Sequence, residues 1–260
     1  YGYFALAEPV NGQAIKLTVV QGNIPQVEKW NRKFRKQIVK TYIDLTDKAS
    51  KDHPLLIVWP ETAVPLSINR NRKLYGDLIY LAHKTNAYLL VGSAESQKFK
   101  KKEIKQPKYW NSAFLINPHS GLDKQQRYDK IRLMPFGEYL PAKDTIPWAY
   151  VQVPNVGGYL PGKELTVFEI SGVKFGATIC WENIFPDLVR KFVKNGAQFI
   201  VNITNEAWFG KTAAPYQFLS MSVLRAVENK VPVVRCANTG ISCFIDQHGR
   251  IVDRVQNNQN

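Results

Sequence analysis

The sequence has few cysteines and histidines, and this scarcity limits the chemistry it can support. Its 260 residues include three cysteines and four histidines. An odd number of cysteines argues against a disulfide framework and leaves room for a reactive thiol. His53, His83, His119 and His248 are too scattered for the ligand spacing of a zinc site. We therefore predict neither a metal site nor a cofactor.

Long apolar runs are also missing. No segment approaches the roughly 20 apolar residues that cross a bilayer as a helix. The longest runs, such as residues 55–59, have the length of buried strands. The opening YGYFALAEPV is too short for a secretory signal and has no basic leader. We expect a soluble chain whose abrupt apolar start is typical of a domain cut from a longer protein.

Positive charge, in contrast, is abundant. The chain has 35 Lys and Arg against 21 Asp and Glu, a formal net charge of +14. This surplus favours a polyanionic partner, either nucleic acid or an anionic membrane surface. The basic segment 98–108 suggests a non-catalytic binding module as one hypothesis. However, this segment has few aromatic residues and no nucleic-acid motif, so we predict a solvated loop and no nucleic-acid partner.

Short apolar runs alternate with segments of helical periodicity. Strands are expected at residues 15–21, 55–59, 87–93, 175–181, 198–204, 232–237 and 241–246, with a hairpin over 111–128. Helices are expected at about residues 30–49, 73–83, 185–195 and 215–229. The order predicts one α/β domain whose helices cover a mixed sheet.

The helix expected over 215–229 has apolar residues at helical spacing. Tyr216, Leu219, Val223 and Val227 are predicted to form its core face. Arg225 and Glu228 are three residues apart, so we expect them to pair on its surface. Trp208 and Phe209 lie in the apolar stretch before this helix, and they either line a ligand entrance or pack in the core.

Glu61 is the first residue with an evident chemical use. It follows an apolar strand in LLIVWPETAVP, at the carboxyl edge where α/β sheets bind ligands. Partial desolvation beside Trp59 and Pro60 would raise its pKa and suit it to general-base catalysis. The alternative is an ordinary helix-capping or solvent-facing glutamate.

A second group lies in YDKIRLMPFGEYLP, where Lys130 and Glu138 flank a turn. A lysine near a thiol favours the thiolate and can also stabilise an oxyanion. The sequence is rich in lysines, however, and a solvated Lys130 is the alternative.

Cys180, in KFGATICWENIFPDLVR, lies where an apolar strand meets a helix. Such an elbow exposes the side chain and leaves main-chain N–H groups free to bind a negative oxygen. If the strand continues, Glu182 shares a face with Cys180 and borders the same pocket. The alternative is a buried structural cysteine, which is how we interpret Cys236 and Cys243.

Taken in order, Glu61 in WPETAVP, Lys130 in YDKIRLMPFGEYLP and Cys180 in ICWEN resemble the Glu-Lys-Cys triad of the nitrilase (carbon–nitrogen hydrolase) superfamily. VVQGNIPQVEKW, PFGEYLP and residues 205–242 are similar to the periplasmic domain of bacterial apolipoprotein N-acyltransferases. The resemblance covers residues 15–251. It implies a single αββα sandwich over residues 15–260, and residues 1–14 as a linker or the end of a membrane-proximal segment.

The resemblance also implies a reaction. Glu61 would take the proton of Cys180, whose thiolate would accept an acyl chain from a phospholipid as a thioester. Lys130 and the Trp181 main-chain N–H would hold the oxyanion, with Glu138 and Glu182 as supporting residues. The acceptor would be the N-terminal diacylglyceryl-cysteine of a lipoprotein.

The same resemblance implies a location. These enzymes lie in the bacterial inner membrane with the catalytic domain facing the periplasm, so membrane helices before and after the domain are expected. An anionic membrane surface would then explain the positive charge. The alternative with the same fold is a soluble nitrilase-family amidase that hydrolyses small C–N substrates.

Overall fold

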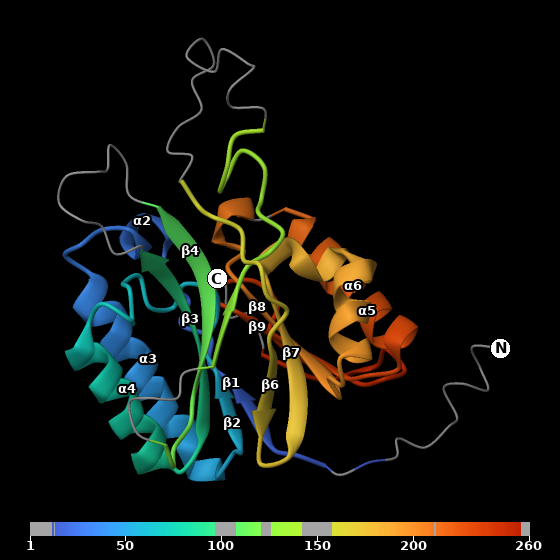
Figure 1. The fold of residues 1–260 in the computed structure, drawn as a ribbon, viewed down its shortest axis with the longest axis horizontal. Helices are drawn as coiled ribbons and strands as arrows, with labels where there is room; N and C mark the ends of the chain where they lie inside the picture. Colours follow the sequence, from blue (N-terminus) through green and yellow to red (C-terminus); the bar gives the residue numbers. More distant parts are fainter. Residues whose placement is uncertain are drawn as a thin grey trace.

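The computed structural model describes residue 12 and residues 14–96, 108–120, 126–141, 158–210 and 212–255. Two mixed sheets pack face to face, and helices cover the outer face of each (Figure 1). This arrangement confirms the predicted αββα sandwich. The basic segment 98–108 lies outside the described residues except for Lys108.

The first sheet has five strands in sequence order. They are β1 (Leu17–Val19), β2 (Leu56–Val58), β3 (Tyr88–Ser96), β4 (Tyr109–Ile116) and β5 (Gln126–Asp129). β1, β2 and β3 are parallel, whereas β4 is antiparallel to both β3 and β5. β2 and β5 therefore point the same way and end at one edge of the sheet.

The second sheet has six strands in the order β11-β10-β9-β8-β7-β6. They are β6 (Val167–Ile170), β7 (Val173–Ile179), β8 (Phe199–Thr204), β9 (Val233–Ala237), β10 (Cys243–Ile245) and β11 (Ile251–Arg254). β7, β8 and β9 are parallel, and the outer strands are antiparallel to their neighbours. Each predicted strand is present, and β6 is an addition that the sequence reading missed.

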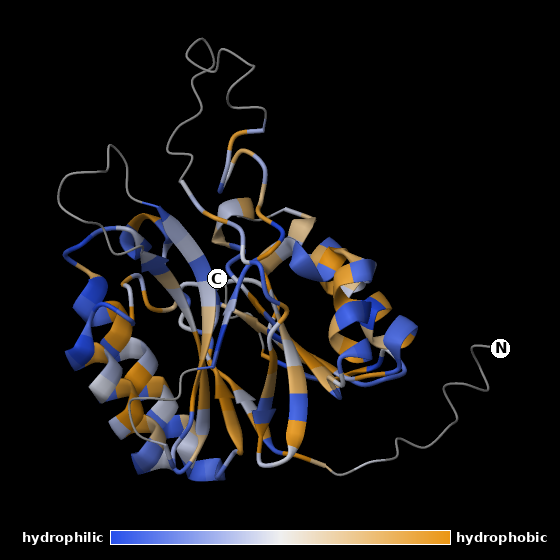
Figure 2. Cartoon of the chain, viewed as in Figure 1, coloured by the Kyte–Doolittle hydropathy of each residue, from blue (hydrophilic) through white to orange (hydrophobic). Residues whose placement is uncertain are grey.

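Four long helices cover the two sheets (Figure 1). α3 (Arg35–Ala49) and α4 (Arg72–Thr85) pack on the first sheet, and α5 (Pro186–Lys194) and α6 (Ala214–Asn229) pack on the second. One apolar core lies beneath α3 and α4, and a larger one joins the facing sheets to α5 and α6. The hydropathy colouring follows this division, with apolar strands between polar outer helix faces (Figure 2).

Three short elements lie at the ends of strands. They are α2 (Gln26–Lys29) and the 3-10 helices η3 (Cys180–Ile184) and η4 (Ala207–Phe209). Another 3-10 helix, η1 (Ser50–Asp52), extends α3. The strand predicted over 175–181 is therefore too long, because β7 ends at Ile179. Cys180 and Trp181 begin η3 instead of ending the strand.

The predicted core face of α6 is wrong in part. Tyr216 and Val227 are exposed, at 67% and 47%, while Ser222, Arg225 and Ala226 are the buried residues of the helix. The pair of Arg225 and Glu228 is present at 2.7 Å, but its arginine is buried rather than on the surface. The reason is a polar cluster beneath the helix, where Arg225 donates to the carbonyl of Ile184.

Trp208 is 68% exposed, which excludes the core contact for this residue. Phe209 instead lies against Phe218, with ring centroids 5.4 Å apart. Within the part of the chain that the structure describes, no helix combines the length and apolar character of a membrane span.

Candidate active site

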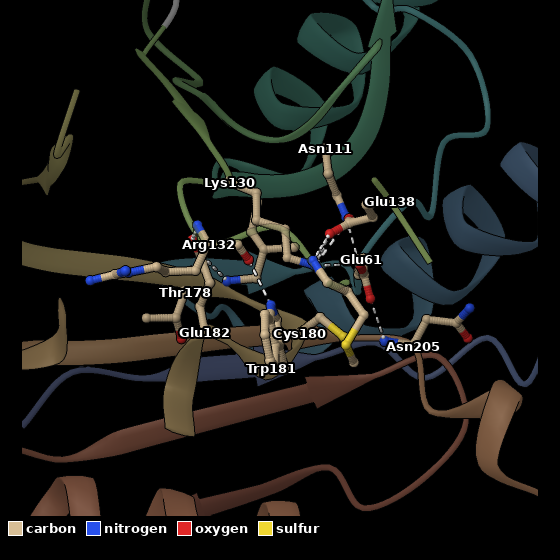
Figure 3. Close-up of polar contacts among 12 residues, drawn as sticks. Glu61, Asn111, Lys130, Arg132, Glu138, Thr178, Cys180, Trp181, Glu182 and Asn205 are labelled. Atoms are coloured by element: carbon tan, nitrogen blue, oxygen red, sulfur yellow. Dashed lines mark hydrogen bonds and ion pairs between the residues drawn. The ribbon is translucent and has the colours of Figure 1, made fainter. Parts of the chain in front are cut away.

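The three residues singled out by sequence meet where the ends of three strands converge. Glu61 follows β2, Lys130 follows β5 and Cys180 follows β7. The first two belong to one sheet and the third to the other, so the site lies between the sheets at their carboxyl ends. Figure 3 shows Glu61, Lys130 and Cys180 gathered in one place, and the Cys180 thiol interacts electrostatically with both Glu61 and Lys130.

Glu61 is held through both carboxylate oxygens. Oε1 accepts from Asn111 Nδ2 at 2.6 Å, and Oε2 accepts from the main-chain N of Asn205 at 2.9 Å. The backbone around Glu61 packs directly on Gly92 of β3, where any larger residue would overlap the Pro60 carbonyl. Glu61 as a whole residue is 8% exposed. The prediction that this glutamate is partly desolvated is therefore confirmed.

Lys130 is a buried cation between two carboxylates. Its side chain is 1% exposed, and Nζ lies 2.9 Å from Glu138 Oε2 and 3.8 Å from Glu61 Oε1. Glu138 also accepts from Asn111 Nδ2 at 2.9 Å and from the main-chain N of Met134 at 2.7 Å. A solvated Lys130 is thereby excluded, and Glu138 belongs to the same cluster.

Burial alone would lower the pKa of Lys130. The charges of Cys180, Glu138 and Glu61 act in the opposite direction and outweigh it, so the pKa lies above its usual range. The ammonium is therefore present at every physiological pH. It provides a permanent positive charge beside the sulfur.

Cys180 occupies an elbow with unusual backbone geometry. Its φ is +58°, a left-handed conformation that costs an L-residue other than glycine, asparagine or aspartate about 1–2 kcal/mol. Asn202 of β8 donates from Nδ2 to the Cys180 carbonyl at 3.0 Å, and Arg235 of β9 in turn donates to Asn202 Oδ1 at 3.1 Å. The neighbouring strands thus hold the elbow, and strain of this kind is typical of functional sites.

Burial raises the pKa of the Cys180 thiol to about 12, and the Glu61 carboxylate adds to this effect. Lys130 and the Trp181 main-chain N–H act in the opposite direction, as the sequence predicted for the lysine, but they do not outweigh burial. The resting thiol is therefore protonated at neutral pH. Before this thiol can react as a thiolate, it must lose its proton.

Glu182 lies beside the Cys180 elbow, but not on a continued strand as the sequence predicted. It belongs to η3 and is fully buried. Its carboxylate accepts from the main-chain N of Ile131 at 2.7 Å, of Arg132 at 2.9 Å and of Ile179 at 2.8 Å. Burial raises its pKa to about 7 despite these hydrogen bonds. Glu182 thus fastens the segment after Lys130 to the Cys180 elbow.

Trp181 contributes to this fastening as well. Its Nε1 donates to the Arg132 carbonyl at 2.6 Å, and its ring packs edge-on against Phe185. The indole therefore lies at the side of the site, while its main-chain N–H faces the sulfur.

Sequence reasoning missed three residues of this cluster, namely Asn111, Asn205 and Lys29. Asn111 donates to both carboxylates, and Lys29 Nζ donates to the Glu61 carbonyl at 2.7 Å. Asn205 follows β8, so its place after a buried strand is a signal of the kind that identified Glu61. Asn111 lies inside β4, and nothing in its local pattern marks it. Within the described ranges, no group of His, Cys, Asp and Glu side chains could hold a metal ion.

An αββα sandwich with a cysteine, a lysine and two glutamates gathered between its sheets has the architecture of the nitrilase class. The carbon–nitrogen hydrolase family model matches residues 16–260, so the chain belongs to that family. Among solved structures, Nit3 of Saccharomyces cerevisiae, a nitrilase superfamily member, matches with a TM-score of 0.67 and 21% identity over 93% of this chain and 85% of its own. A mutant of the amidase from Nesterenkonia sp. AN1 matches at 0.64 and 15%, over 93% and 89%.

Curated relatives are more similar in sequence. An apolipoprotein N-acyltransferase of Geobacter metallireducens is 40% identical over 252 residues, which are 96% of this chain and 47% of the relative. Another, of Bdellovibrio bacteriovorus, is 32% identical over 92% of this chain and 46% of its own length. The chain thus spans about half the length of the curated relatives it matches.

Proposed function

We propose that this chain is the catalytic domain of an apolipoprotein N-acyltransferase, which transfers an acyl chain from a phospholipid to the N-terminal amine of a lipoprotein. The observation that carries the proposal is the meeting of Cys180, Glu61 and Lys130 in a chain that is 40% identical to such an enzyme. Two-step transfer requires a nucleophile, a base and a site for an oxyanion, and the cluster offers all three.

In the first step, the Glu61 carboxylate takes the proton of the Cys180 thiol as sulfur attacks the ester carbonyl of the donor. The carbonyl oxygen becomes an oxyanion, which the Lys130 ammonium and the Trp181 main-chain N–H stabilise. The intermediate collapses to a thioester as the C–O bond breaks, and Glu61 returns the proton to the departing alkoxide. A lysophospholipid leaves.

In the second step, the amine of the diacylglyceryl-cysteine attacks the thioester carbonyl. Glu61 accepts a proton from the attacking nitrogen, and the same two donors hold the new oxyanion. The C–S bond then breaks, giving an amide, and the Cys180 thiolate is protonated by Glu61. Glu138 and Asn111 keep Lys130 and Glu61 in place during both steps.

The surface beside the site supports a bilayer substrate. Phe136 and Tyr139, which flank Glu138 along the chain, are 54% and 39% exposed, and Trp208 after β8 is 68% exposed. Exposed aromatic side chains are favourable at the level of lipid headgroups. With a formal charge of +14, the chain also suits the anionic surface of an inner membrane, here its periplasmic face.

The test uses a phospholipid whose sn-1 acyl chain is labelled, presented in mixed micelles to the purified protein. Label bound to the Cys180 peptide through a bond that hydroxylamine cleaves is the expected result. Hydrolysis of small amides with no label on Cys180 would refute acyl transfer and favour an amidase. A Cys180→Ser variant is the matched control for label held without a thioester.

A further inference from the structure

One buried charged side chain that contacts Glu61 has no role in the proposed reaction. Lys29 ends α2, and its side chain is 2% exposed, whereas Val27 and Trp30 beside it are 84% and 43% exposed. Removing an ammonium from water is unfavourable unless nearby groups compensate. The burial of Lys29 therefore points to a compensating group inside the protein.

That group is the backbone and charge of Glu61. Lys29 Nζ donates to the Glu61 carbonyl at 2.7 Å, and among the described residues it has no ion-pair contact with a carboxylate. Burial lowers the pKa of Lys29 to about 8, and the charges of Glu61 and Cys180 oppose this shift. The ammonium thus shares an electrostatic environment with the candidate base and the candidate nucleophile.

The charge balance of the cluster explains why a second cation is useful. Glu61 and Glu138 both contact Asn111 Nδ2, and Lys130 lies between them as a single ammonium. Two carboxylates this close repel each other unless positive charge compensates. With Lys29 charged, two carboxylates and the Cys180 sulfur face two ammonium groups.

We propose that Lys29 is a positioning residue of this site, which fixes the Glu61 backbone and supplies a second positive charge beside Glu61 and the Cys180 sulfur. The role rests on the proposed function, in which Glu61 is the base. It acts through Glu61 and does not require Lys29 to touch a substrate.

Other groups also contribute to the electrostatic environment of Glu61. They are Lys130 after β5, Glu138 in the turn that follows, Cys180 in η3, Tyr159, the Asn205 main-chain N–H and Glu206 after β8. All of these groups are the same in wild type and in the Lys29 variants, so a difference in rate between variants is due to the lysine.

The experiment measures alkylation of Cys180 by iodoacetamide from pH 6 to 10, followed by mass spectrometry of the Cys180 peptide. Alkylation needs the thiolate and the base but no lipid. We expect Lys29→Met to react about tenfold more slowly than wild type below pH 8. Loss of the positive charge should raise the pKa of the Cys180 thiol by about one unit, which lowers the thiolate fraction about tenfold. The difference should close above about pH 9, because wild-type Lys29 has then lost its own charge.

Lys29→Arg keeps a positive charge at every pH. We expect it to react within about threefold of wild type below pH 8 and faster than wild type above pH 9. This variant decides the matter if Lys29→Met fails to fold, since an Arg variant that follows the wild-type curve at high pH would refute the charge role. Lys33→Met, which removes an exposed lysine near α2, is the matched control and should match wild type throughout.

Lys29→Met with a wild-type rate and pH profile would overturn the proposal. An equal slowing at all pH values would also overturn it, because a purely structural role does not depend on the charge of Lys29. Since alkylation involves no acyl donor, this result is independent of the labelled-lipid test. A failure of the Lys29 role can therefore be distinguished from a failure of the proposed function.

Discussion

Cys180 is partly buried just after β7 and Cys236 is fully buried in β9 of the same sheet, and their surroundings differ completely. Cys236 lies inside β9, fully buried, with its thiol 3.2 Å from the Val58 carbonyl and 3.6 Å from the Val20 carbonyl. Cys180 lies in the elbow after β7 and faces two carboxylates and an ammonium. Burial raises the pKa of both thiols.

The difference teaches that burial does not distinguish a structural cysteine from a reactive one. Carbonyl oxygens around Cys236 accept a hydrogen bond from the thiol but cannot take its proton. In the proposed reaction, Glu61 takes the proton of Cys180 and Lys130 stabilises the charge that results. Reactivity therefore depends on the groups beyond the sulfur. The following substitutions test this comparison.

The largest contrast is expected from alanine at each cysteine. Cys180→Ala should abolish transfer of labelled acyl chains to an acceptor, because no other group at the site can form the thioester. Cys236→Ala should retain transfer within about threefold, since its sulfur is remote from the proton relay. The measurement is label on the acceptor per enzyme. Substantial transfer by Cys180→Ala would end the assignment of the nucleophile.

Glu61→Gln should slow acylation of Cys180 by about 10²- to 10⁴-fold, the usual contribution of a general base. The amide keeps the size of the side chain but cannot accept the thiol proton. A single-turnover assay with labelled phospholipid measures this step. The control is Glu169→Gln, which changes an exposed carboxylate on β6 and should leave the rate unchanged. A wild-type rate in Glu61→Gln would exclude Glu61 as the base.

The pH dependence of Cys180 alkylation gives an intermediate effect. Because its pKa is raised to about 12, the thiolate fraction in wild type should still be increasing at pH 10. Lys130→Met removes the main opposing charge, so it should raise the thiol pKa and lower the rate about tenfold or more at pH 8. Cys236 should remain unmodified in the folded protein at every pH. A rate that levels off below pH 8 would contradict the raised pKa.

The smallest effect concerns backbone geometry and has opposite signs at the two positions. At Cys180, φ is +58°, so Cys180→Gly should be about 1 kcal/mol more stable than Cys180→Ala. At Cys236 the backbone is an ordinary strand, so glycine should be about 0.5–1 kcal/mol less stable than alanine. Urea denaturation of the four variants measures both differences. If glycine were less stable than alanine at both positions, the elbow at Cys180 would not be strained.

Much of the fold could be predicted because its signals are local. The apolar runs at β2 and β8 are buried along their whole length and those at β3 and β7 along most of it, so composition alone identifies them. The face of α6 could not be predicted in the same way. Arg225 and Ser222 are buried there because partners from other elements bind them, and apolar spacing contains no information about such partners.

The site divides along the same line. Glu61 and Cys180 could be predicted because each follows an apolar run, and the resemblance to a known triad linked them to Lys130. Asn111 and Asn205 contact Glu61 across 50 and 144 residues of sequence, and Lys29 does so across 32. Nothing local marks Asn111 or Lys29 as buried. The roles of all these residues remain predictions for the experiments above.

The sequence by itself determined the order of strands and helices and the α/β class, whereas the αββα sandwich and the link between an acid, an amine and a thiol came from the resemblance to a known family. It did so because hydrophobic periodicity and reactive residue types are properties of short stretches of chain. Only the tertiary structure decided that the ends of β2, β5 and β7 meet, that Cys180 adopts a left-handed backbone, and that a second lysine lies behind Glu61. These features depend on how two sheets pack, since contacts between distant segments determine burial and charge together.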